Sequence, residues 1–207
     1  MDIKEIKSAI EAKFKKNIPS HIFLDRMRLI DEDSRKGFAY NDPTYIAFYY
    51  WLGTLLETKA LIEIGFRLGL LSGSFLRSCK TVKYFLALQE IKGNEFYSER
   101  LGRSNIKDVY KKDLYIHVGG LDNDVFESKL KSCEFDLAII NEESSYDRHR
   151  LYFDLLWPQL ASGGIIVVDY LKRYKPSATA FKDFCISKNI EPTYVKTTYG
   201  VGLIRKD

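Results

Sequence analysis

A carboxylate and two glycines lie close together near the first third of the chain, in Glu63-Ile-Gly65 and at Gly69. Glycine lets a backbone turn tightly and approach a ligand because it has no Cβ. A carboxylate two residues before the first glycine can pair with a cationic group of that ligand. An apolar run precedes Gly65 and a helical pattern follows Gly69, so the segment predicts a strand, a turn and a helix start. The same pattern also fits a strand–helix turn that binds nothing.

Two later segments place polar residues after apolar runs. A loop from Asn141 to Tyr146 follows the run 135–140, and Asp169 closes the run that begins after Gly163-Gly164. We expect the two glycines to turn the chain between a helix and that strand. In open sheets of parallel strands, ligands bind at the carboxyl ends of the strands. These polar residues are therefore expected to meet the glycine turn at one edge of a sheet.

Strand and helix patterns alternate from residue 59 onward. The expected strands are residues 60–64, 82–88, 114–118, 135–140, 164–169, 193–197 and 201–205. Helical patterns separate the first five, for example at 72–77, 122–130 and 147–156, and another fills 178–187. Such alternation predicts a parallel sheet with right-handed crossovers. The last two strands form a hairpin, so at least one strand is antiparallel.

The first third of the chain is predicted to be helical. Apolar residues recur at helical spacing in residues 3–14 and again, as Phe23, Met27 and Ile30, in a second segment. A third helix, expected over residues 44–58, is rich in aromatic side chains. Packing against the sheet or a second subunit is the default interpretation of these aromatics, and stacking on a substrate is the less favoured one. Because the helix is more apolar than one side of a sheet requires, we expect a homodimer formed through this helix or the segment before it.

Composition excludes several classes of protein. The chain has 207 residues and a net charge of +4 spread along the sequence, which calls for no nucleic-acid partner. Three distant cysteines form no metal-binding or disulfide pattern, so a reducing cytoplasm is expected. No apolar run is long enough to span a membrane, and the polar start does not resemble a signal peptide.

In their order, these segments resemble class I S-adenosylmethionine (SAM)-dependent methyltransferases. The likeness is to the small-molecule O-methyltransferase branch that includes catechol- and cephalosporin-type enzymes. It rests on the Glu-x-Gly-x-x-x-Gly motif from Glu63, the Phe135-Asp136 strand with its polar loop, and Pro158-x-Leu-x-x-Gly-Gly-x-x-x-x-Asp169. It covers residues 59–207 and is expected to include the helix before them. The resemblance implies SAM as cofactor and a small-molecule or sugar-like acceptor.

The fold implied is a three-layer α/β/α sandwich around a Rossmann-like, mostly parallel seven-stranded sheet with an antiparallel C-terminal strand. Residues 1–58 are expected to be an N-terminal helical extension, and residues 59–207 the SAM-binding domain. The residues that the resemblance implies at the cofactor site are Glu63, Gly65, Phe66, Gly69, Gln89, Glu90, Gly119 and Asn141.

The chain departs from the family at several of these positions. Gln89, followed by Glu90, stands where an acid usually holds the ribose, and Gly119-Gly120 stands where an acid lies near adenine. The loop acid that binds a metal in the family is Asn141, and the loop histidine is Ser144. These changes favour an alternative function: a methyltransferase fold that binds or regulates without catalysis.

The departures from the metal-dependent members of the family predict chemistry without a metal. Asn141, Asp169 and Tyr170 stand at the metal-ligand positions, and only Asp169 is an anion at neutral pH. An acceptor hydroxyl would then need a protein base, and the candidates are, in order, Asp169, His149 and Tyr146; the favoured interpretation of His149 is nevertheless a solvent-facing helix residue. A nicotinamide-dependent oxidoreductase is the less favoured rival, because Gly65-Phe66-Arg67 lacks the Gly-x-Gly that meets a pyrophosphate.

Overall fold

The computed structural model describes residues 1–14, 43–89, 96–119 and 124–207. Its strands are β1 (Ala60–Ile64), β2 (Tyr84–Leu88), β3 (Tyr115–Gly119), β4 (Phe135–Ile140), β5 (Leu160–Val168), β6 (Thr193–Val195) and β7 (Val201–Arg205). Its helices are α1 (Ile3–Phe14), α3 (Pro43–Leu55), α4 (Leu70–Ser78), α5 (Phe96–Val109), α6 (Asp124–Ser132), α7 (Tyr146–Gln159) and α8 (Lys175–Ser187). The second predicted helix, with Phe23, Met27 and Ile30, lies outside the described residues.

All seven strands form one sheet in the order β3-β2-β1-β4-β5-β7-β6. The first five are parallel, and β7 runs antiparallel to both β5 and β6. The chain moves outward from β1 to β3, then returns to the other side of β1 with β4 and β5. The sequence-based prediction of a mostly parallel sheet with an antiparallel C-terminal strand is confirmed.

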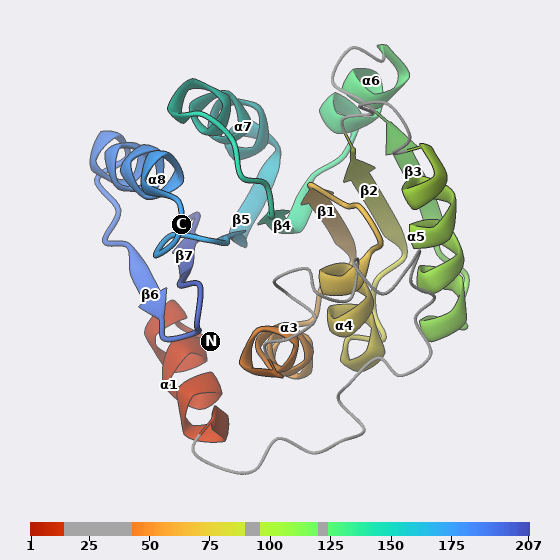
Figure 1. Ribbon diagram of the computed structural model, residues 1–207, viewed down its shortest axis with the longest axis horizontal. Helices are drawn as coiled ribbons and strands as arrows, with labels where there is room; N and C mark the ends of the chain where they lie inside the picture. Colours follow the sequence, from red (N-terminus) through yellow and green to blue (C-terminus); the bar gives the residue numbers. More distant parts are fainter. Residues whose placement is uncertain (15–42, 90–95, 120–123) are drawn as a thin grey trace.

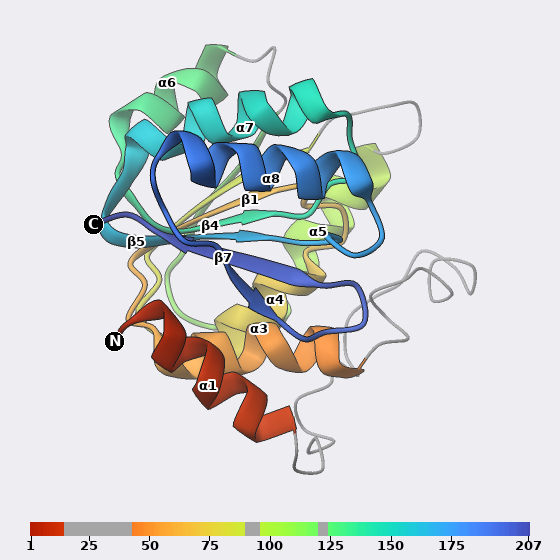
Figure 2. The same ribbon diagram turned by 90° about the vertical axis from the view of Figure 1, so that its left-hand side faces the viewer.

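Helices cover both faces of this sheet, which gives the three predicted layers (Figures 1 and 2). On one face lie α1, α3 and α4, and on the other lie α6, α7 and α8. Alternate strand residues supply the two cores: Leu61 packs with the α3 side, and Ile62 with the α7–α8 side. No helix in the described ranges is long and apolar enough to cross a membrane.

Most aromatic side chains of helix α3 are buried within the chain. Tyr45, Phe48 and Tyr49 have no exposed surface, and Trp51 keeps only 6% of its own. They pack against α1, α4 and the sheet, within one apolar core. The exposed apolar face on which the homodimer prediction rested is therefore covered by the chain itself. The homodimer stays a prediction without that support.

The structure corrects the predicted start of β5. This strand begins at Leu160, not at the Gly-Gly pair, and its pairing with β4 shifts between Phe135↔Leu160 and Leu137↔Ile165. Gly163 lies in this irregular stretch with φ of 77°, a left-handed conformation that glycine adopts without strain. The glycines thus accommodate a bulge within the strand instead of turning the chain before it.

Candidate functional site

Three candidate residues lie side by side at the carboxyl edge of the sheet. The amide nitrogen of Gly65 donates to Leu88 O at 2.9 Å, that of Asn141 to Ile64 O at 2.8 Å, and that of Asp169 to Ile140 O at 3.0 Å. Each residue therefore stands one position beyond the end of its strand. The convergence expected from the sequence is present, on the neighbouring strands β1, β4 and β5.

Packing within the chain already requires glycine at both positions of the turn. Gly65 has φ of 82°, and a Cβ there would lie 2.2 Å from the carbonyl oxygen of Asn141. Gly69, with φ of 67°, precedes α4, and its Cβ would lie 2.8 Å from the ring of Phe66. Any larger residue would collide with the chain at either position. The two glycines alone thus do not distinguish a ligand-binding turn from a structural one.

Glu63 lies beneath this turn with no exposed surface. Ser72, in the first turn of α4, donates its hydroxyl to Oε2, while Oε1 has no hydrogen-bond partner among the described residues. Burial raises the pKa of this carboxyl to about 8; Ser72 opposes the shift, and the charge of Asp169 adds to it. A buried carboxylate oxygen without a donor is costly, so this atom is suited to a ligand that brings one.

Asp169 repeats this arrangement at the end of β5. Its side chain is buried, Tyr49 of α3 donates to Oδ2, and Oδ1 has no partner among the described residues. Burial raises its pKa to about 7, and the phenols of Tyr49 and Tyr45 offset part of the shift. Asp169 can therefore exchange a proton near neutral pH.

Asn141 links the two acidic positions. Tyr45 donates its hydroxyl to Oδ1 of Asn141 at 3.2 Å, and Nδ2 of Asn141 donates to Gly65 O at 3.3 Å. The rings of Tyr45, Tyr170 and Tyr199, which we call the tyrosine cluster, have pairwise centroid distances of 5.8–6.0 Å. Tyr170 directly follows Asp169 and has φ of 63°, a strained conformation for a residue with a Cβ.

The remaining cofactor candidates surround the glycine turn. Gln89 follows β2, and its Oε1 accepts a hydrogen bond from the backbone nitrogen of Arg67 at 2.5 Å. Gly119 ends β3 and accepts from the backbone nitrogen of Gln89 at 3.0 Å. Phe66 points its ring into the core, edge-on to Phe85 at 5.5 Å, so only its backbone lies in the turn. Glu90 and Gly120 lie outside the described residues.

The structure places the other two candidate bases in the opposite layer. His149 is fully buried, which corrects its expected solvent exposure; Nδ1 contacts Ser144 Oγ at 2.9 Å, and burial lowers the pKa of the ring. Tyr146 donates to Asp183 of α8 at 3.0 Å. Both belong to the α7–α8 side of the sheet, whereas Asp169 faces α3. Of the three candidates, only Asp169 meets the glycine turn.

Three residues that donate hydrogen bonds to the candidate side chains were not predicted from the sequence: Tyr45, Tyr49 and Ser72. Tyr45 and Tyr49 are four residues apart on α3, so their hydroxyls share one face of the helix. That spacing was available in the sequence. We interpreted these tyrosines as packing residues, because the sequence alone does not show whether a buried tyrosine also uses its hydroxyl in a hydrogen bond.

Two acids of the loop after β4, Glu142 and Glu143, interact with residues outside the carboxyl-edge site. Tyr152 donates to Glu142 Oε2 at 2.5 Å, and Glu143 lies 3.7 Å from the guanidinium of Arg173. In the parts of the chain that the structure covers, His, Cys, Asp and Glu side chains form no group of three able to hold a metal ion.

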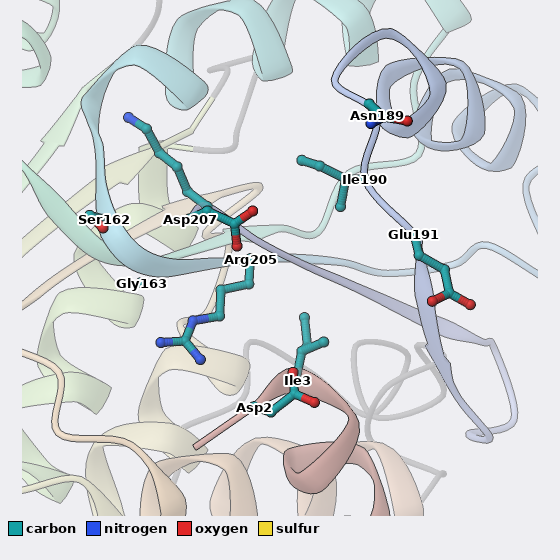
Figure 3. Close-up of a pocket in the computed structure, with 10 residues that line it drawn as sticks. Asp2, Ile3, Ser162, Gly163, Asn189, Ile190, Glu191, Arg205 and Asp207 are labelled. Atoms are coloured by element: carbon teal, nitrogen blue, oxygen red, sulfur yellow. The ribbon is translucent and has the colours of Figure 1, made fainter.

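A separate cavity of about 600 Å³ lies at the opposite edge of the sheet (Figure 3). It is bordered by the start of α1, the start of β5 and the residues after α8 and β7. The chain itself engages its cationic groups: Arg205 donates to Met1 O at 2.6 Å, and Lys206 donates to Leu160 O at 2.6 Å. This cavity shares no residue with the carboxyl-edge cluster.

No family model and no curated protein matches the sequence. Solved structures do match its fold. The SAH-bound methyltransferase PaMTH1 of Podospora anserina has a TM-score of 0.66 and 17% identity, with 100% of this chain and 97% of that chain covered. A putative caffeoyl-CoA O-methyltransferase from Staphylococcus aureus has a TM-score of 0.62 and 12% identity, covering 99% and 100%. The O-methyltransferase from Bacillus cereus in complex with SAH has a TM-score of 0.59 and 15% identity, covering 100% and 92%. The chain therefore has the fold that these methyltransferases share.

Proposed function

We propose that this chain is a SAM-dependent methyltransferase for a small-molecule acceptor. The observation that carries the proposal is the buried Glu63 carboxyl group, one oxygen of which has no hydrogen-bond partner among the described residues. This position lies on β1, beside the point where the strand order reverses between β1 and β4. Ligands of such sheets bind at that point. The neighbours crystallised with SAH support the choice of ligand.

The chain offers chemically suitable groups for each part of SAM. Oε1 of Glu63 can accept a hydrogen bond from the ammonium of the methionine end. Gln89 and Gly119, at the ends of β2 and β3, are suited to the ribose and the adenine. SAM supplies an electrophilic methyl group on its sulfonium, and the chain's contribution is to orient an acceptor in line with it.

Asp169 is the proposed proton acceptor, and Tyr49 is its positioning residue. A base with a pKa of about 7 is matched to work near neutral pH. We also propose that the chemistry needs no metal. Asn141 is already hydrogen-bonded to Tyr45 and Gly65. Of the three positions that hold the metal in the family, only Asp169 has an acidic side chain. Addition of a chelator should leave methyl transfer unchanged.

The alternative is a methyltransferase fold that binds without catalysis. The loop after β4 favours it, because two of its polar side chains are held by α7: Ser144 by His149, and Glu142 by Tyr152. A loop fastened in this way supplies no free catalytic group. The two functions differ in turnover and not in SAM binding.

Titration calorimetry with SAM and SAH tests the shared claim. We expect one site, and release of a proton on SAM binding at pH 7, because Glu63 is neutral in the free chain and must ionise to pair with an ammonium. Two buffers of different ionisation enthalpy measure that proton. Glu63→Gln should lose the proton release, while Glu134→Gln, an exposed control, should keep it. A folded chain that binds neither compound contradicts the proposal.

Transfer of a labelled methyl group from SAM to a small-molecule extract then separates the enzyme from the binding module. A homodimer, a cytoplasmic location and a boundary between an extension (1–58) and a catalytic domain (59–207) remain proposals. Light scattering at high micromolar concentration tests the first. A chain of residues 59–207 that folds and binds SAM would support the boundary.

A further inference from the structure

The two buried carboxylates face the same side of the sheet. Glu63 pairs in register with Ile139 of β4, and Ile139 with Val167 of β5, so Asp169 lies two residues further along on the same face. Both side chains lie on the α3 side of the sheet, and the charge of each raises the pKa of Tyr49. Each keeps one oxygen that no described residue satisfies.

Among the described residues, no cationic side chain pairs with either acid. Hydrogen bonds to Glu63 and Asp169 in the described chain come from uncharged groups, chiefly the hydroxyls of Ser72 and Tyr49, with smaller contributions from Asn141 and Tyr45. Burial raises the pKa of both carboxyls, and the charge of Asp169 adds to the shift at Glu63, which is the effect expected of a site without a cation. A ligand that brings positive charge and N–H donors would relieve both costs.

The tyrosine cluster adds a second feature that favours a cation. Tyr170 directly follows Asp169 in the sequence, and Tyr199 is partly exposed, so the cluster extends from the residue next to Asp169 to the surface. Tyrosine ring faces attract cations. The guanidinium of Arg173 already lies 5.9 Å from the centroid of Tyr199. Asp169 is buried, so entry of a ligand requires neighbouring side chains to move.

We propose that the acceptor is an amine, bound as its ammonium form by Asp169 and the tyrosine cluster; this rests on the proposed function and names its substrate class. Glu63 would serve the ammonium of SAM, and Asp169 that of the acceptor. A hydroxyl acceptor supplies a single donor and no charge, so it would leave Asp169 buried without compensation. An ammonium supplies up to three donors and the missing charge.

The reaction balances without a metal or a further reactant. Asp169 takes one proton from the acceptor ammonium, which frees the nitrogen lone pair. The nitrogen attacks the methyl carbon of SAM as the S–CH₃ bond breaks, and the bonding electrons stay on sulfur. The products are a methylated ammonium and neutral SAH. Asp169 then releases its proton to solvent.

Matched probes test this proposal. Benzylamine and 2-phenylethylamine are titrated into the SAH-loaded chain at pH 8, beside benzyl alcohol and 2-phenylethanol, and turnover of each with SAM is followed by mass spectrometry. We expect the amines to bind at least roughly tenfold more tightly than the alcohols and to gain a methyl group. Asp169→Asn should abolish that preference, and the exposed control Asp154→Asn should retain it.

Each remaining outcome is decisive. Alcohols bound or methylated as well as amines, binding of none of the four probes, or an amine preference that survives in folded Asp169→Asn would overturn the proposal. Tyr49→Phe provides a second variant if Asp169→Asn fails to fold, and it should weaken amine binding without affecting SAH. If SAM and SAH do not bind but the amines do, the proposed function fails while the cation site stands.

Discussion

Raising the pH from 6.5 to 8 should destabilise the folded chain. In the fold, the pKa of Glu63 is raised from 4.5 to about 8, and that of Asp169 from 3.8 to about 7. Between the ordinary and the raised value, the unfolded chain is ionised while the folded chain holds its proton. Each pH step in that window therefore favours unfolding, and stability is lost as pH rises through the folded pKa.

The size of the stability loss follows from the pH range over which each carboxyl group titrates. Each group contributes at most about 1.4 kcal/mol per pH unit. From pH 6.5 to 8, Glu63 titrates over about 1.5 units and Asp169 over about 0.5 unit, so the upper limit is about 3 kcal/mol. Half of this would lower Tm by roughly 3–6 °C in a chain of this size. His149, whose pKa is lowered, contributes in the opposite direction, but only below its ordinary value of 6.5.

Thermal unfolding followed by circular dichroism at constant ionic strength measures this slope. Glu63→Gln and Asp169→Asn should each flatten it, because neither amide titrates. Glu134→Gln, with its exposed side chain, should keep the wild-type slope. A wild-type Tm that is constant or rises from pH 6.5 to 8 would refute the reasoning, as would an unchanged slope in both buried-acid variants.

Three further predictions concern single side chains. Tyr49→Phe removes the hydroxyl donor to buried Asp169 and should lower the free energy of unfolding by roughly 1–3 kcal/mol in urea titrations; no change would show that the bond contributes nothing. Gly65→Ala should cost at least about 2 kcal/mol, because its Cβ would lie 2.2 Å from Asn141 O at φ of 82°; a stable variant would contradict the turn geometry. Asp136→Ala removes the acceptor of two backbone N–H groups at the start of β1, at 2.7 and 2.8 Å, and should cost about 1–3 kcal/mol by the same measurement; wild-type stability would disprove this.

Local pattern was enough to predict most of the fold. Strands β1, β4 and β7 have the predicted bounds, because short apolar runs ended by glycine or polar residues specify buried strands closely. The start of β5 was wrong because a bulge depends on the partner strand β4, which no local pattern reveals. Helix α5 was not among the helices named, since it has few apolar residues among many polar ones, although those few share one face of the helix.

The candidate site was predictable only where it follows strand ends. Glu63, Gly65, Asn141 and Asp169 were found because parallel strands deliver their last residues to one edge. The bond from Tyr49 to Asp169 spans 120 residues of sequence and depends on how α3 packs on the sheet. The burial of His149 likewise depends on the contact between α7 and the sheet, which the helical pattern alone does not specify.

A crystal structure of the chain grown with SAH tests the central claim most directly. The proposed function predicts SAH across the carboxyl ends of β1 and β4, with its ammonium at Oε1 of Glu63 and its ribose beside Gln89. SAH bound elsewhere, or an empty carboxyl edge at saturating SAH, would contradict it.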